Sequence, residues 1–289
     1  MKNFFKLDKP TFSFEIFPPK GSGELSKIFD TIDALASLDP DLISVTYGAG
    51  GSSRENTVEI ASKIQTDYSI PALAHLTCIG STRDEMRLTL DKLKDKGIRN
   101  ILAMRGDIGE EGTKDFKHAS DLIGFINDNY DFNIFAACYP EKHIEAYSMD
   151  EDLTYLKAKC DCGVSALVSQ LFFDNEVFYS FRDRARKLGI TTRIEAGIMP
   201  ITSASQINRM VSMCGASMPP AIQKIIRAYG HNSMAMREAG IAYATNQIID
   251  LLAEGVDGIH LYTMNLPEIA KRICENVRGV LYSLRVKRG

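Results

Sequence analysis

Two carboxylates stand where the sequence around them is apolar. Glu15 interrupts one apolar run, and Asp107 directly follows another. If the first run is a strand, Glu15 shares a face with Ser13 and Phe17, because alternate side chains point the same way. A buried carboxylate costs on the order of several kcal/mol unless it is paired or used. A structural ion pair is one possible use, and general acid or base catalysis, which suits a pair of carboxylates, is the other.

Other polar side chains recur near the ends of further β-rich runs. They are Ser44, Thr46, His75, Thr77, Arg105, Tyr139, Gln170, His260 and Tyr262. Strands that are covered on both faces normally read as continuous apolar runs, so this recurrence points to a shared site. The residues predicted to form an active site are Glu15, Asp107 and Gln170, with Thr46, His75 and Tyr139 around them.

Eight β-rich runs alternate with segments of helical periodicity. The runs are Thr11–Phe17, Leu42–Tyr47, Ala72–Cys78, Asn100–Gly106, Asn133–Tyr139, Ala166–Phe172, Arg193–Met199 and Gly258–Met264. Their starts are separated by 31, 30, 28, 33, 33, 27 and 65 residues. Steps of about 30 residues are the size of one βα unit. The long last step predicts extra helices near Ser205–Met213 and Ser233–Ala253, with a helix restarting after Pro219-Pro220.

This alternation predicts an α/β fold, a (βα)8 TIM barrel with extra helices between strands 7 and 8. Residues 1–289 are expected to form a single catalytic domain, with the site at the carboxyl ends of the strands. An open dinucleotide-binding sheet is the main rival. The glycine-rich run Gly48–Ser53 has the wrong spacing for it, and we interpret that run as a turn before a helix capped by Ser53.

Composition excludes several classes of protein. A net charge of −3 and a pI of about 6.0 argue against a nucleic-acid partner. No apolar run approaches a membrane span, and no signal peptide is evident at the start, so a cytoplasmic location is expected. The six scattered cysteines suggest free thiols rather than a disulfide scaffold or a metal site. The predicted strands hold no lysine for a Schiff base and no zinc-binding histidine spacing.

Seven motifs in order resemble the short bacterial type of methylenetetrahydrofolate reductase, over nearly the whole chain. They are Phe12–Pro19, Ser44–Ala49, His75–Cys78, Arg105–Asp107, Tyr139–Glu141 with His143, Gln170–Asp174, and His260–Asn265. The resemblance implies noncovalent FAD, a tetramer, and a role in one-carbon metabolism and methionine supply. It also implies two stages. NADH or NADPH reduces the flavin and leaves; methylenetetrahydrofolate then binds, opens to an iminium and takes the hydride.

The same resemblance implies roles for individual residues. Glu15 matches the general acid that protonates the folate, and Asp107 matches a carboxylate that stabilises the iminium. Gln170 matches a pterin contact, and Tyr262 and Met210 fall at substrate positions. The residues that match flavin contacts are Thr46, His75, Arg105, Gly106, Asp107, Ala119, Tyr139, His143, Asp152, Tyr155 and Lys159. Structural histidines at 75 and 143, a helix-terminal charge at 152 and a packing role for residue 262 are the alternatives.

The chain departs from the family pattern at five positions. Tyr155 and Ala158 replace an asparagine and an arginine beside the flavin, and Val164 replaces an alanine. Met210 replaces an aromatic residue, and Leu266 replaces a basic one. These departures leave open whether NAD(P)H or a partner protein supplies the electrons. A pterin-binding methyl-transfer barrel without flavin is a third hypothesis.

Overall fold

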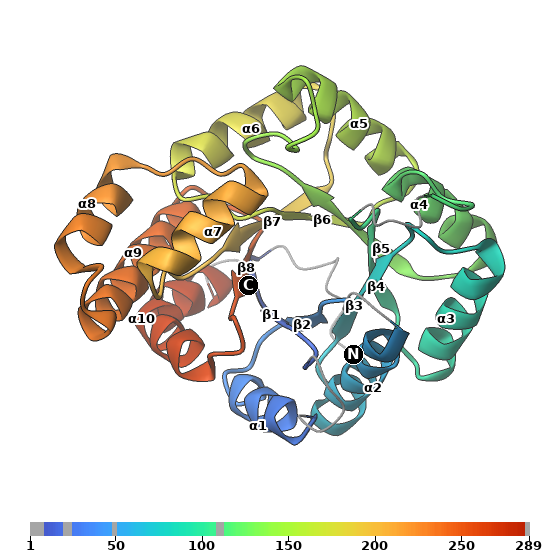
Figure 1. The fold of residues 1–289 in the computed structure, drawn as a ribbon, viewed down its shortest axis with the longest axis horizontal. Coiled ribbons are helices and arrows are strands. Elements are labelled where there is room, and N and C mark those ends of the chain that lie inside the picture. The colour runs from blue at the N-terminus through green and yellow to red at the C-terminus, as the bar shows by residue number, and fades with distance from the viewer. Residues whose placement is uncertain (1–8, 20–24, 48–50, 108–112, 287–289) are drawn as a thin grey trace. The chain divides into compact units, whose positions relative to one another are not determined.

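The predicted (βα)8 barrel is confirmed. The computed structural model describes residues 9–19, 25–47, 51–107 and 113–286, and its eight parallel strands close into a barrel in chain order (Figure 1). The strands are β1 (Thr11–Ile16), β2 (Leu42–Val45), β3 (Ala72–Thr77), β4 (Asn100–Met104), β5 (Asn133–Cys138), β6 (Ala166–Ser169), β7 (Arg193–Ile198) and β8 (Gly258–Tyr262). The helices are α1 (Leu25–Ala36), α2 (Gly51–Tyr68), α3 (Arg83–Asp95), α4 (Ala119–Asn129), α5 (Met149–Asp161), α6 (Asn175–Lys187), α7 (Ala204–Cys214), α8 (Pro220–Tyr229), α9 (Ser233–Ala253) and α10 (Pro267–Val286).

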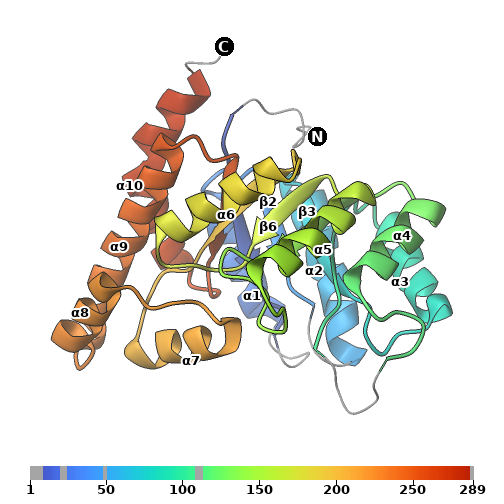
Figure 2. The same ribbon diagram turned by 90° about the horizontal axis from the view of Figure 1, so that it is seen from above.

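Contacts group the chain into two compact units. The first includes Ser13–Ala137 and Ala158–Leu167, and the second includes Cys138–Lys157, the chain from Val168 onward and the first residues of β1. In the first unit β1 to β4 lie side by side, with Phe14 of β1 opposite Ile43 of β2 (Figure 1). In the second unit the long helices α9 and α10 run alongside each other (Figure 2).

Local signals explain where helices begin. Thr82 caps α3: its hydroxyl accepts the Glu85 N–H at 3.2 Å, while the Glu85 carboxylate accepts the Thr82 N–H at 2.8 Å. This reciprocal capping box satisfies two amides that the first helical turn would otherwise leave without partners. Met86, Leu90 and Leu93 then bury one face. The prediction that Ser53 caps α2 is wrong, because that helix already begins at Gly51.

Several strands end earlier than predicted, and this places the polar residues in the βα loops. β2 ends at Val45, β4 at Met104 and β6 at Ser169, two or three residues before the predicted ends. Backbone pairing continues at isolated points: the Thr46 N–H still donates to the Ile16 carbonyl at 3.0 Å, and the Gln170 N–H donates to the Cys138 carbonyl at 2.8 Å. The loop residues after β2 and β6 are therefore still bonded to the ends of the neighbouring strands β1 and β5.

The long step between β7 and β8 contains the extra helices, as predicted, with α8 beginning at Pro220. These helices pack around a hydrophobic cluster of their own. Its buried members are Leu171, Phe173, Met199, Ile201, Ile207, Ala216, Ile222 and Met236. Gly240 lets α9 approach this cluster, since a Cβ there would lie 1.7 Å from the Ile201 carbonyl oxygen.

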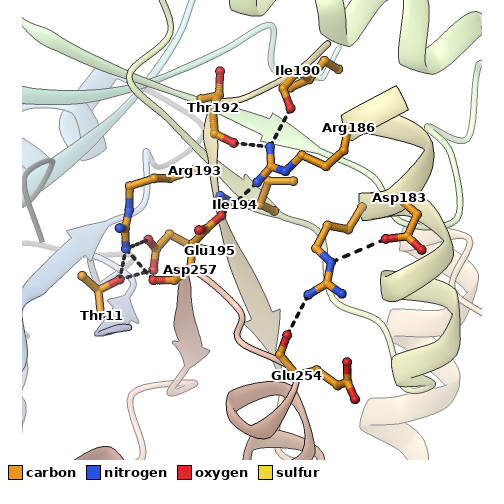
Figure 3. A network of polar contacts seen from close by, with 11 residues as sticks. Thr11, Asp183, Arg186, Ile190, Thr192, Arg193, Ile194, Glu195, Glu254 and Asp257 are labelled. Atoms are coloured by element: carbon orange, nitrogen blue, oxygen red, sulfur yellow. Dashed lines mark hydrogen bonds and ion pairs between the residues drawn. The ribbon is translucent and has the colours of Figure 1, made fainter. Parts of the chain in front are cut away.

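Another buried glutamate, which was not predicted from the sequence, lies near the amino ends of the strands (Figure 3). Glu195 of β7 is 1% exposed and accepts a hydrogen bond of 2.6 Å from the Thr11 hydroxyl. The Arg193 guanidinium lies 3.6 Å from its other oxygen and also donates to the Asp257 carbonyl. Burial raises the pKa of Glu195, against the opposing effects of Thr11 and Arg193. Polar groups at this end of a barrel usually serve stability.

Two glycines in long helices should respond in opposite ways to alanine. Gly240→Ala should lower the free energy of unfolding by about 3 kcal/mol or more, because the new methyl group meets backbone that cannot move aside. Gly279→Ala in α10 should raise it by about 0.5–1 kcal/mol, since nothing lies within 4 Å of the new Cβ and alanine favours a helix. Urea unfolding measures both, and equal effects of the two substitutions would contradict this packing.

Candidate active site

Glu15 and His75 face each other in the first unit. Glu15 lies in β1 and His75 in β3, and they are 8% and 4% exposed. His75 Nε2 lies 3.6 Å from Glu15 Oε2. Because β2 separates their strands, the two side chains can meet only on the same face of the sheet, above the fully buried Ser44. The predicted carboxylate is thus buried as expected and has a titratable neighbour.

The segment after β4 holds Asp107 at the surface. Gly106 adopts a φ of +87°, and a Cβ on it would lie 2.9 Å from Thr77 Cβ, so the backbone passes close to β3. The amides of Cys78 and Ile79 donate to the Arg105 carbonyl at 3.2 and 2.9 Å. Asp107 therefore follows a firmly anchored backbone, and its side chain is exposed.

The other predicted flavin contacts of the first unit are Thr46, Ala119 and Lys159. Hydrogen bonds between side chains and backbone carbonyls involve two of them, Thr46 and Lys159. Thr46 is half-buried, and its carbonyl accepts the Thr57 hydroxyl at 3.0 Å. Ala119 is the first residue of α4. The Lys159 ammonium, predicted to meet the flavin pyrophosphate, donates to the Ala137 carbonyl at 2.8 Å near the end of β5. That bond uses one of the three donors of the ammonium group.

The loop after β5, in the second unit, brings Tyr139 and His143 together. Their rings meet edge to face with centroids 4.7 Å apart. The Asp152 carboxylate accepts the His143 N–H at 3.0 Å, and His143 Nδ1 accepts the Glu145 N–H at 3.1 Å. Asp152 therefore secures this loop from the first turn of α5. Tyr139, His143 and Asp152 can make these contacts within the loop and also the predicted contacts with the cofactor.

Gln170 and Tyr262 are both half-buried in the second unit. The Gln170 amide oxygen accepts the Leu171 N–H at 2.8 Å, which orients the side chain. The Tyr262 hydroxyl donates to the Ser169 carbonyl at 2.7 Å. Gly197 makes room for this ring, because a Cβ there would lie 2.8 Å from it and 2.2 Å from the Ser169 oxygen. Tyr262 thus has the packing role that the sequence left open, whether or not it also touches substrate.

The residues that depart from the family pattern have different environments. Met210 of α7 and Tyr262 both pack against the hydrophobic cluster of the extra helices. Tyr155 of α5 is 59% exposed, and its hydroxyl lies 3.4 Å from the Glu151 carboxylate. Val164 is buried, and Leu266 is half-buried.

One contact that holds this region in place was not predicted from the sequence. Glu141 accepts the backbone N–H of Ser217, 76 residues away, with both carboxylate oxygens. Glu141 belongs to one of the motifs that resemble the family, but a charged residue on a loop ordinarily faces water, so the sequence gives no reason to expect this partner.

Comparison with known proteins decides the family. The family model described as methylenetetrahydrofolate reductase matches residues 1–278. The chain belongs to the methylenetetrahydrofolate reductase family, a family of oxidoreductases. The 5,10-methylenetetrahydrofolate reductases of Pectobacterium carotovorum and Escherichia coli are each 36% identical over 265 residues, which cover 92% of this chain and 89% and 90% of theirs. The Arabidopsis thaliana enzyme named methylenetetrahydrofolate reductase (NADH) 1 is 33% identical, and 51% of its length is covered.

Solved structures with little sequence similarity share the fold. A Clostridium thermocellum protein that binds two copies of 5-methyl-5,6,7,8-tetrahydrofolic acid has a TM-score of 0.68 at 14% identity, covering 97% of this chain and 98% of its own. Dihydropteroate synthase from Xanthomonas albilineans has a TM-score of 0.55 at 11% identity, covering 94% and 93%. In the described parts of this reductase-family chain, no helix could cross a membrane and no group of three metal-binding side chains occurs.

Tyr262→Phe distinguishes packing from substrate contact. Loss of the hydroxyl leaves the carbonyl of the buried Ser169 without this donor, so the free energy of unfolding should fall by about 1–2 kcal/mol. If packing is the only role, KM for folate stays unchanged. Tyr147→Phe, at a residue that is 94% exposed, is the matched control and should alter neither quantity. An unchanged stability in Tyr262→Phe together with a raised KM would make Tyr262 a substrate contact instead.

Proposed function

We propose that this protein reduces 5,10-methylenetetrahydrofolate to 5-methyltetrahydrofolate, with NADH or NADPH as electron donor and noncovalent FAD as cofactor. The observation that carries the proposal is the buried Glu15–His75 pair in a chain of this reductase family. The product would supply methyl groups for methionine. A homo-oligomer in the cytoplasm is the expected setting.

The side chains of the first unit suit a flavin with an anionic diphosphate. Arg105 and Lys159 supply cations, and Thr46 and His75 supply hydrogen-bonding groups at the ends of strands. The close approach of Gly106 to Thr77 leaves backbone rather than a side chain on this surface. FAD, when bound, would carry a hydride from the nicotinamide to the folate. Tyr139, His143, Asp152, Tyr155 and Ala119 are the further proposed contacts.

Glu15 is the proposed proton donor. It would pass its proton to a folate nitrogen as the imidazolidine C–N bond opens, and the resulting cation would then be able to accept hydride. Burial keeps bulk water from the carboxyl group, so the proton goes to the substrate rather than to solvent. His75, whose Nε2 lies 3.6 Å from Glu15 Oε2, is the polar neighbour of the carboxyl group in this buried position.

Asp107 and Gln170 are proposed to bind the reacting folate. The Asp107 carboxylate would stabilise the cation by its negative charge and accept hydrogen bonds from the pterin. Gln170 would offer its amide to the pterin, in an orientation set by the bond between its oxygen and the Leu171 N–H. Met210 and Tyr262 would complete the substrate contacts.

Stopped-flow measurement of each half-reaction tests the central role of Glu15. Glu15→Gln cannot release a proton, so folate reduction should fall by about 10²-fold or more, while flavin reduction by NADH should change little. Glu195→Gln is the matched control: Glu195 is also a buried glutamate but lies near the amino ends of the strands, bonded to the Thr11 hydroxyl, so both half-reactions should survive. Equal loss of both half-reactions in Glu15→Gln would refute the assignment.

Asp107→Asn should slow folate reduction by about tenfold to a hundredfold, since the cation loses its nearest proposed negative charge. The visible absorption spectrum of the bound flavin should also shift. Asp115→Asn, at an exposed residue of the same connection, serves as the control. An unchanged rate of folate reduction would remove the electrostatic role of Asp107.

An electron-donor protein in place of NAD(P)H is the second candidate, and the non-aromatic Met210 and the non-basic Leu266 favour it. Steady-state oxidation of NADH with menadione as acceptor separates the two. A yellow, FAD-loaded protein that cannot oxidise NADH or NADPH, yet reduces folate with a chemical reductant, would favour the partner. A protein that takes up no flavin at all would favour a non-redox pterin-binding barrel.

A further inference from the structure

We propose that Glu141 is a positioning residue for folate binding, which holds the connection between α7 and α8 and through it the helix that carries Met210. This inference rests on the proposed function, because its readout is the binding of folate. It concerns only residues of the second compact unit.

The contact itself is a charge-assisted hydrogen bond to backbone. The Ser217 N–H lies 2.9 Å from one Glu141 carboxylate oxygen and 3.0 Å from the other. A carboxylate that accepts an amide proton makes a stronger bond than a neutral acceptor does. Because the donor is backbone, the bond fixes the path of the chain at residue 217 rather than one rotamer of a side chain.

The loop that presents Glu141 is held rigidly. The Lys142 N–H closes a turn on the Tyr139 carbonyl at 3.1 Å, and Lys142 adopts a φ of +67°, which is unusual for a residue with a side chain. The Lys142 ammonium donates to the Ala146 carbonyl at 2.8 Å. Such a conformation persists only where the surroundings impose it. The same turn carries Tyr139 and leads into His143, the proposed flavin contacts of this loop.

Glu141 is bonded to the segment that directly follows α7. Gly215 ends that helix in a left-handed conformation, with φ +69°. Ala216 is buried in the hydrophobic cluster of the extra helices, and Met218 packs against that cluster. Ser217, between them, is exposed. Apolar packing on either side and one charged bond at the centre therefore determine where the chain leaves α7.

Fixing the chain at the end of α7 should affect the binding of substrate. Met210 lies one turn before the end of α7 and packs against the same cluster. Glu141 thus joins the loop with the proposed flavin contacts to the helix with a proposed folate contact, although it touches neither ligand. Without the bond, α7 would sample more positions, and folate would bind at the cost of ordering it. Chemistry in the bound complex would be largely unaffected.

Three variants test the proposal in the FAD-loaded protein. Glu141→Ala should raise KM for methylenetetrahydrofolate about tenfold, which corresponds to about 1.4 kcal/mol, with kcat and the rate of flavin reduction by NADH within about twofold. Glu141→Gln, which keeps an acceptor without the charge, should fall between Glu141→Ala and the unmodified protein. Ser217→Ala keeps the N–H and should match the unmodified protein. Hydrogen exchange of the Ser217 amide should quicken in Glu141→Ala and not in Ser217→Ala.

The outcomes separate this inference from the proposed function. An unmodified protein that reduces folate, with an unchanged KM in Glu141→Ala, would overturn the positioning role alone. Loss of thermal stability without a change in KM would reduce Glu141 to a structural contact and also overturn it. Failure of the unmodified protein to reduce folate with any donor would overturn the proposed function, and the positioning role with it.

Discussion

The free-energy cost of burying a carboxylate inside the barrel is the constraint on which the proposed active site depends. Glu15 is 8% exposed, and its oxygen lies 3.6 Å from a nitrogen of His75, which is also buried. A carboxyl group in such a place is stable only with a polar neighbour or a ligand that pairs with it. The strands β1 and β3 position this pair, and the other proposed ligand contacts lie in the loops and helices that follow the strands and, for Tyr262, at the end of β8.

Two buried glutamates in one barrel show how surroundings divide their roles. Glu195 lies near the amino ends of the strands, bonded to the Thr11 hydroxyl and beside the Arg193 guanidinium. Its partners are themselves parts of a network that extends to Asp257 (Figure 3), so it is suited to holding strands together. Glu15 lies one residue before the end of β1, where the strand gives way to a loop. Glu15 and Glu195 are the same type of residue. Their positions along the strands distinguish the stabilising role of Glu195 from the proposed catalytic role of Glu15.

Local pattern predicted the elements well. The recurrence of apolar runs at about 30-residue steps predicted eight βα units, and the barrel is confirmed. Polar side chains near the ends of those runs predicted a buried Glu15 beside other polar groups, and the contact with His75 agrees with this. Strand ends were less accurate, because residues such as Thr46 and Gln170 retain single backbone bonds after the ladder has stopped. The Ser53 cap was wrong because the helix already begins at Gly51, so Ser53 lies within its first turn.

What the sequence could not reveal depends on distant partners. The contact between Thr11 and Glu195 joins residues 184 apart, and that between Glu141 and Ser217 joins residues 76 apart. No periodicity within one strand or helix encodes such pairings, because they follow from how the elements pack.

A crystal structure of the FAD-loaded protein with a bound reduced folate tests the central claim most directly. If Glu15 is the proton donor, a folate ring nitrogen should lie within about 2.6–3.2 Å of a Glu15 carboxyl oxygen, or one water away from it. A folate bound elsewhere on the protein, with Glu15 still in contact only with His75 and other protein groups, would contradict it.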